Sequence, residues 1–169
     1  FILGCVAVGM VYVQFKSELP DVESLKTVEL QQPMQIYTSD GKLIGEVGEQ
    51  RRVPVKLENI PEKLIQAVLA TEDSRFYEHH GLDPIGIARA LMVTINKGGT
   101  SQGASTITQQ LARNFFLTSE KTFTRKAKEA ILAIEIENAL NTQEILELYL
   151  NKIYLGYRSY GVAAAAKTY

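Results

Sequence analysis

The fold is decided by one stretch, Glu72-Asp73-Ser74-Arg75-Phe76-Tyr77-Glu78-His79-His80-Gly81. It closes a run of helical character that begins near Pro61. The apolar side chains of this run recur at helical spacing, at Ile65, Val68 and Leu69. At about 100° per residue, Glu72 falls in the same stripe, so the helix directs a carboxylate where hydrocarbon is expected.

An inward carboxylate has two interpretations, and this helix alone does not choose between them. Removing a carboxylate from water is costly unless the group is paired or protonated. Glu72 is therefore either a buried salt-bridge partner of Arg75 or another cation, or a catalytic group. Apolar surroundings favour the second role because they tune a carboxylate for general acid–base chemistry.

Length, composition and charge limit the classes of protein that the chain can represent. It has 169 residues, and its 46% apolar content is enough for one domain with a proper core. Eighteen Lys and Arg against 19 Asp and Glu give a net charge of −1, so we expect no nucleic-acid partner. Cys5 is the single cysteine and the two histidines are neighbours, so no Cys/His cluster has metal-ligand spacing.

The chain opens on an uncharged apolar run from Phe1 to Phe15. As a helix this run would be about 22 Å long, short of the ~30 Å hydrocarbon core. Because it starts on Phe rather than Met, we interpret residues 1–16 as a transmembrane anchor truncated at its N-terminus. A signal peptide is the alternative, but no small-x-small cleavage site follows. The next flank lacks the Lys/Arg excess of a cytoplasmic side, which places the rest outside the cytoplasm.

Residues 17–60 are predicted to be a connector that contains a β-hairpin. The hairpin comprises Met34–Tyr37 and Leu43–Val47 on either side of Asp40-Gly41, a strong short-range turn signal. A third short strand is predicted at Arg52–Val55.

From Pro61 onward the pattern is helical. Asp83-Pro84 is typical of a helix start, and Gly98-Gly99 of its end. The small, polar stretch from 98 to 103 is either a substrate-gating loop or a plain linker. Thr106 and Gln109 have capping-box spacing, which indicates a helix N-terminus or, in the functional interpretation, an anion or sugar site.

The predicted helix from Phe123 to Leu140 carries Lys121, Arg125, Lys126 and Lys128 at its start. Positive charge has the wrong sign for the dipole there, so a negative partner is expected. Glu129 lies on an apolar stripe and is a second inward carboxylate, unless it is only an exposed i,i+4 partner of Arg125. A last helix, residues 144–154, has Asn141 or Thr142 as its cap.

These stretches resemble, in order and spacing, the motifs of one family: the peptidoglycan glycosyltransferase domain (glycosyltransferase family 51) of class A penicillin-binding proteins, most closely the 1A type. The matching motifs are Glu72-Asp73-x-x-Phe76-x-x-His79-x-Gly81, Gly103-x-Ser105-Thr106-x-Thr108-Gln109-Gln110, Arg125-Lys126-x-x-Glu129 and Ile145-Leu146-x-x-Tyr149-Leu150-Asn151. Gly161–Tyr169 is similar to the beginning of a fifth motif. Thr142 departs from the family, which usually has Lys there.

The resemblance implies a mainly α, lysozyme-like domain at residues 61–169, truncated at its C-terminus, on the periplasmic side of the bacterial inner membrane. Such a domain polymerises lipid II into β-1,4-linked glycan strands with inversion and releases undecaprenyl pyrophosphate. The implied partners are lipid II, the growing strand, the membrane and a C-terminal transpeptidase domain.

The resemblance also implies roles for individual residues. Glu72 would be the general base, and Arg125 and Lys126 would neutralise the leaving pyrophosphate. Glu129 would either orient these cations or hold a divalent cation, Mg²⁺ or Mn²⁺; no organic cofactor is implied. The donor side would be lined by Ser105, Gln109, Gln110 and Tyr154, and Glu72 would be braced by Asp73, Phe76 and His79.

Two other functions stay open at this level. A lysozyme-like peptidoglycan hydrolase uses one catalytic glutamate on a similar fold, with less need for a basic cluster or an anchor. A non-catalytic, membrane-anchored glycan-binding module would keep the fold and tolerate the loss of Glu72.

Overall fold

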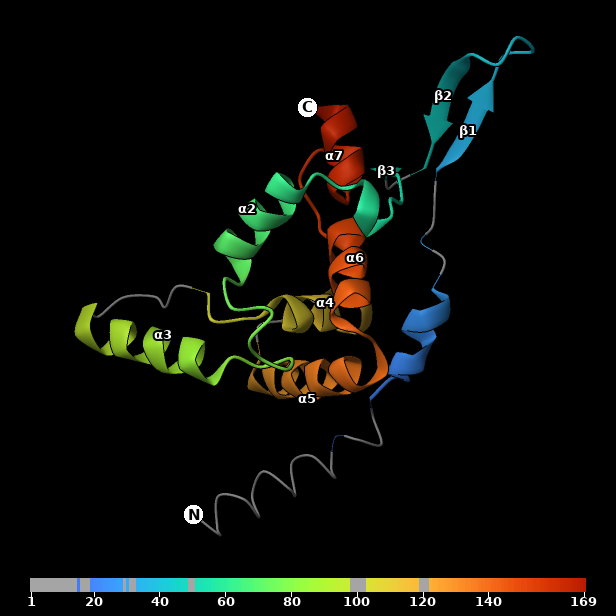
Figure 1. Cartoon of the computed structure of the whole chain (residues 1–169). Helices are drawn as coiled ribbons and strands as arrows, with labels where there is room; N and C mark the ends of the chain where they lie inside the picture. The colour runs from blue at the N-terminus through green and yellow to red at the C-terminus, as the bar shows by residue number, and fades with distance from the viewer. Residues whose placement is uncertain are drawn as a thin grey trace.

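The computed structural model describes residues 15, 19–28, 30, 33–48, 51–97, 103–118 and 122–169. Over these residues the chain is mainly helical with two small two-stranded sheets (Figure 1), which confirms the predicted class. In chain order the elements are η1 (Val22–Thr27), β1 (Met34–Tyr37), β2 (Leu43–Val47), β3 (Arg51–Arg52), η2 (Leu57–Asn59), α2 (Glu62–Glu72), α3 (Pro84–Lys97), α4 (Ile107–Phe116), α5 (Phe123–Ala139), α6 (Thr142–Lys152), β4 (Ser159–Tyr160) and α7 (Val162–Thr168).

The core lies where α4 packs against α5 and α6 (Figure 1). Each of these helices contributes side chains with no exposed surface, among them Leu111, Leu132 and Tyr149. The stripe of α2, with Ile65, Val68 and Leu69, covers this cluster from outside and is only partly buried. Burial of these apolar faces is the main stabilising term, and it fixes α4, whose start lines the site, against α5 and α6.

Side-chain caps set where the helices begin. Thr106 and Gln109 form a complete capping box at α4, as their spacing predicted. Of the two predicted caps for α6, Asn141 is the one used: its side chain accepts from Glu144 N, and Glu144 caps in return. At α3 the Asp83 carboxylate accepts from Gly86 N at 2.8 Å, so the predicted Asp83-Pro84 start is confirmed.

The predicted hairpin is confirmed, with β1 antiparallel to β2 and Gly41 in the turn at φ +80°. That backbone angle favours glycine, as a tight hairpin turn requires. The hairpin stands away from the helices (Figure 1), as does α3, whose apolar Leu91, Met92 and Ile95 are exposed.

The prediction of a strand at Arg52–Val55 was wrong. The strand is Arg51–Arg52, and it pairs in parallel with β4, more than 100 residues later in the chain. Val55 is not in a ladder because the side chain of Asn151 satisfies its backbone: Val55 N donates to Oδ1 and Val55 O accepts from Nδ2, both at 2.8 Å. The amide side chain takes the place of a neighbouring strand.

The predicted membrane anchor, residues 1–16, lies outside the described residues apart from Phe15, and so does most of the predicted loop from 98 to 103. Within the part of the chain that the structure describes, none of the helices combines the length and the hydrophobicity needed to span a bilayer.

Because Asn151 is 5% exposed and also donates to Glu147 O at 2.9 Å, its removal leaves the part-buried backbone groups of Val55 without their partners. We expect Asn151→Ala to lower the free energy of unfolding by about 2 kcal/mol, measured by chemical denaturation. The control is Asn138→Ala on the exposed side of α5, for which a change within about 0.5 kcal/mol is expected. Equal losses in the two variants would mean that Asn151 does not hold the connector.

Candidate active site

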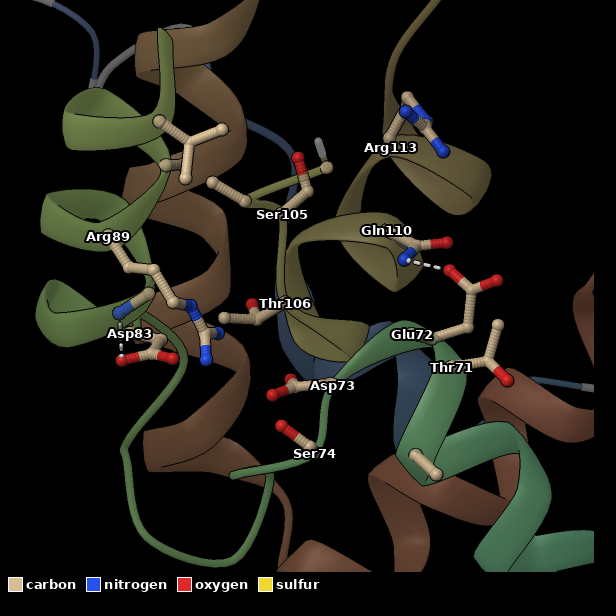
Figure 2. Close-up of a pocket in the computed structure, with 16 residues that line it drawn as sticks. Thr71, Glu72, Asp73, Ser74, Asp83, Arg89, Ser105, Thr106, Gln110 and Arg113 are labelled. Atoms are coloured by element: carbon tan, nitrogen blue, oxygen red, sulfur yellow. Dashed lines mark hydrogen bonds between the residues drawn. The ribbon is translucent and has the colours of Figure 1, made fainter. Parts of the chain in front are cut away.

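A cavity of about 700 Å³ lies between the end of α2, the inner side of α3 and the start of α4 (Figure 2). The sequence-predicted residues that line it are Glu72, Asp73, Ser105 and Gln110. Three separate segments therefore bring the first and second motifs together at one cavity. Its volume is in the range of a site for a small organic ligand or one part of a larger one.

Glu72 is the last residue of α2 and is half-buried at the cavity wall. Gln110 Nε2 donates to its Oε2 at 2.9 Å, and Figure 2 shows this bond crossing from α4 to α2. Among the described residues Glu72 has no ion-pair partner, and its Oε1 accepts no hydrogen bond. The carboxylate is therefore held on one oxygen and open to a ligand on the other.

Arg75, the partner considered for Glu72, pairs instead with Asp83. The salt-bridge interpretation of Glu72 through Arg75 is therefore wrong. Burial acts to raise the pKa of Asp83, but hydrogen bonds from Gly86 N and Arg75, together with the Arg75 charge, outweigh it and leave the pKa below its usual value. The pair thus persists near neutral pH and closes the loop between α2 and α3.

Asp73 joins the end of α2 to the beginning of α4. His79 Nε2 lies 3.0 Å from both of its carboxylate oxygens, and Ile107 N donates to Oδ2 at 3.0 Å. Phe76 is 2% exposed and belongs to the core. These contacts hold the backbone directly after Glu72 in place. They are consistent with the bracing role predicted for Asp73, Phe76 and His79.

Glu129 is completely buried, and two cations bind its two oxygens. Arg125 donates to Oε2 at 2.7 Å and Lys126 to Oε1 at 2.6 Å. Lys126 also donates to Ser105 Oγ at 2.8 Å, and Ser105 lines the cavity. The third motif therefore reaches the cavity through Ser105. Glu129 is not the exposed i,i+4 partner that was the alternative.

A divalent cation held by Glu129 does not fit this arrangement. Both carboxylate oxygens are taken by Arg125 and Lys126, and no group of three or more His, Cys, Asp or Glu side chains suited to a metal occurs in the described ranges. Two roles were inferred for Glu129, to orient the cations or to hold a metal. Its contacts support the first.

Besides Arg125 and Lys126, two further predicted substrate residues, Gln109 and Tyr154, lie outside the cavity lining. Gln109 is 3% exposed, and its Oε1 accepts from Thr106 N within the capping box. Tyr154 is exposed, and its ring centroid lies 5.0 Å from that of Tyr160. Their substrate-binding roles stay predictions, and the cavity gives them no support.

Two arginines that the sequence analysis missed line the cavity. Arg89 extends from α3 and Arg113 from α4 (Figure 2). Arg113 follows Gln110 by three residues and so lies on the same helix face, a signal that the spacing contained. Arg89 sits on a face with Gly86, Ala90 and Val93, the α3 residues that also line the cavity.

Residues 40–169 match the family described as Transglycosylase, and the chain belongs to it. The particular relatives are penicillin-binding proteins 1A. The chain is 75% identical over 168 residues to that of Haemophilus influenzae and 61% identical over 168 residues to that of Escherichia coli, in each case over 99% of this chain. It spans only 18% and 20% of their lengths.

A crystal structure of penicillin-binding protein 1A from Haemophilus influenzae aligns with 84% of this chain and 12% of that one, at 46% identity and a TM-score of 0.37. That superposition is too loose to support a structural comparison, so the assignment rests on sequence. The predicted resemblance to the glycosyltransferase domain of class A penicillin-binding proteins is confirmed by the family match and by these relatives.

Replacing Glu129 by Gln keeps its shape and removes the counter-charge of two cations. Because the carboxylate is buried, we expect Glu129→Gln to lower the free energy of unfolding by about 3 kcal/mol in urea denaturation. The matched control is Glu23→Gln, which breaks the exposed pair with Lys26 at 2.7 Å and should cost less than about 1 kcal/mol. A loss no larger than that of the control would show that the buried pairs do not hold this part of the fold.

Proposed function

We propose that this chain is the glycosyltransferase domain of a peptidoglycan synthase, which polymerises lipid II into β-1,4-linked glycan strands and releases undecaprenyl pyrophosphate. One observation carries the proposal. Glu72, with no ion-pair partner among the described residues, lines a cavity together with Ser105, and Ser105 accepts from Lys126, one of the two cations held by the buried Glu129. A base beside an electropositive end suits transfer of a sugar from a phosphate leaving group.

In this proposal Glu72 acts as the general base. Gln110 holds Oε2, and Oε1 is available to take the proton of the acceptor's 4-hydroxyl. The hydroxyl oxygen then attacks C1 of the donor sugar while the bond from C1 to the pyrophosphate oxygen breaks. Attack from the opposite side inverts the α-linkage to a β-glycoside, as in inverting glycosidases but with a sugar hydroxyl in place of water.

In this proposal Arg125 and Lys126 neutralise the negative charge of the leaving pyrophosphate. Arg125 Nε is a buried donor that has no hydrogen-bond partner among the described residues. Guanidinium groups and ammonium groups bind phosphate oxygens strongly in partly desolvated sites. Glu129 touches neither sugar in this scheme; it is a positioning residue that holds both cations, of which Lys126 also donates to the cavity-lining Ser105. No step is routed through a metal.

The proposal also includes three further features that the resemblance implies. They are a lysozyme-like arrangement of the helices, a place on the periplasmic side of the inner membrane, and a transpeptidase domain that follows in the same polypeptide. The last of these is supported by relatives that are named penicillin-binding protein 1A and are about five times as long as this chain.

A hydrolase remains the competing activity, and the cations argue against it. When a glycan is hydrolysed, the leaving group is a sugar hydroxyl rather than a pyrophosphate. Such a leaving group does not need the arginine and the lysine that the buried carboxylate of Glu129 holds. A non-catalytic module does not call for a carboxylate with one oxygen left open in a cavity. The hydrolase would give different products from the proposed enzyme, and the non-catalytic module would give none.

We expect Glu72→Gln to lower the turnover of labelled lipid II by at least about 100-fold, because the amide cannot accept the proton. Gln can still bond with Gln110, so the melting temperature should stay within a few degrees of the unchanged protein. Glu62→Gln, an exposed change at the other end of α2, is the control and should leave turnover unchanged.

Product sizing completes this experiment. Long glycan with free undecaprenyl pyrophosphate supports the transferase, and cleaved muropeptides would support the hydrolase. Turnover by the Glu72→Gln protein equal to that of the unchanged protein would remove Glu72 from the role of base.

A further inference from the structure

A chain of two hydrogen bonds connects the core to Glu72. It begins at Tyr149, a residue to which the resemblance assigned no role. The hydroxyl of Tyr149 in α6 donates to Gln110 Oε1 in α4 at 3.2 Å. Gln110 Nε2 in turn donates to Glu72 Oε2 at the end of α2. Three helices that are far apart in the sequence thus meet in one chain of donors and acceptors.

The direction of this chain depends on Tyr149. The two ends of an amide have nearly the same shape, so only its partners decide which end faces Glu72. When Glu72 holds a proton, a turned amide would also be possible by geometry, with Oε1 accepting from Glu72 and Nε2 donating to the tyrosine oxygen. In that orientation the tyrosine proton loses its acceptor.

That loss is costly because Tyr149 has no exposed surface. Within the described ranges Gln110 is the single hydrogen-bond partner of its hydroxyl. A buried donor without an acceptor is disfavoured, so the turned amide is disfavoured as well. Burial, and then the negative charge of Glu72, raise the pKa of Tyr149, so the hydroxyl keeps the proton that it donates.

We propose that Tyr149 is a positioning residue for glycosyl transfer: its hydroxyl fixes the Gln110 amide with the NH₂ group toward Glu72, which leaves Glu72 Oε1 directed to the acceptor hydroxyl before and after proton transfer. Gln110, predicted from the motifs as a substrate ligand, thereby becomes the link between the core and the base. The inference rests on the proposed function, because it presumes that Glu72 takes a proton.

The simpler alternative is that the Tyr149 ring fills the core and its hydroxyl takes the nearest acceptor. The two interpretations differ in one respect. If Tyr149 acts through Gln110, removing its hydroxyl matters only while Gln110 is present, and the two substitutions are not additive. If it acts only through packing, its effect is independent of Gln110.

The test is a double-substitution cycle in the intact protein, with labelled lipid II as substrate and kcat and KM measured for each variant. We expect Tyr149→Phe to lower kcat about tenfold, the factor that one hydrogen bond supports, with KM within about twofold. In the Gln110→Ala protein, which is itself slower, we expect Tyr149→Phe to cause no further loss of kcat.

Ser159→Ala is the matched control, since it also removes one fully buried, hydrogen-bonded hydroxyl, here the partner of Thr168 at 2.7 Å. It should leave kcat unchanged and remain additive with Gln110→Ala. The inference is overturned if Tyr149→Phe leaves kcat unchanged, if it lowers kcat by the same factor in both backgrounds, or if it loses its fold, since a hydroxyl that only orients Gln110 is not needed for packing. Failure of the unchanged protein to polymerise lipid II would instead overturn the proposed function.

Discussion

The cation side of the site depends on the ion pairs that Glu129 makes inside the molecule. Its side chain is buried, and a carboxylate in that position is tolerated only when its charge and its oxygens are satisfied. Arg125 and Lys126 satisfy them from the first turns of α5, where the helix dipole disfavours positive charge. The carboxylate and the cations therefore require each other, and the result is a fixed positive site next to Ser105.

Asp73 is a second buried carboxylate, and its contacts fix the segments on the other side of the cavity. Asp73 binds His79 and the first amide of α4, so the end of α2 is fixed to the start of α4. Glu72 precedes Asp73 and is carried to the cavity wall by that link. Glu72, the proposed base, comes from α2 and the cations come from α5, and α4 lies between them with Gln110 on one side and Ser105 just before its cap. The site is thus built from contacts between helices rather than within any one of them.

Much of this arrangement could be predicted from local spacing. Helical periodicity placed Glu72 on the inner face of α2 and Glu129 on a buried face of α5, and both lie there. The capping box at Thr106 and the hairpin turn at Gly41 are local signals and were read correctly. Arg113 was missed although its spacing from Gln110 contained the information.

The contacts that were missed are ones that helical or strand spacing does not specify. The partner of Arg75 is Asp83, across a loop whose path has no periodicity. The backbone of Val55 is satisfied by Asn151, 96 positions later, which is why the predicted strand does not form. The bond from Tyr149 to Gln110 depends on the packing of α6 against α4, which no residue pattern specifies.

The central claim is that one cleft places the base near the acceptor hydroxyl and the cation pair near the pyrophosphate. A crystal structure of the protein with an uncleavable lipid II analogue tests it most directly. We expect the pyrophosphate oxygens within about 3 Å of the nitrogens of Arg125 and Lys126, with the sugar bound between them and Glu72. A pyrophosphate bound at Arg89, with Arg125 and Lys126 still engaged only by Glu129 and Ser105, would contradict the claim.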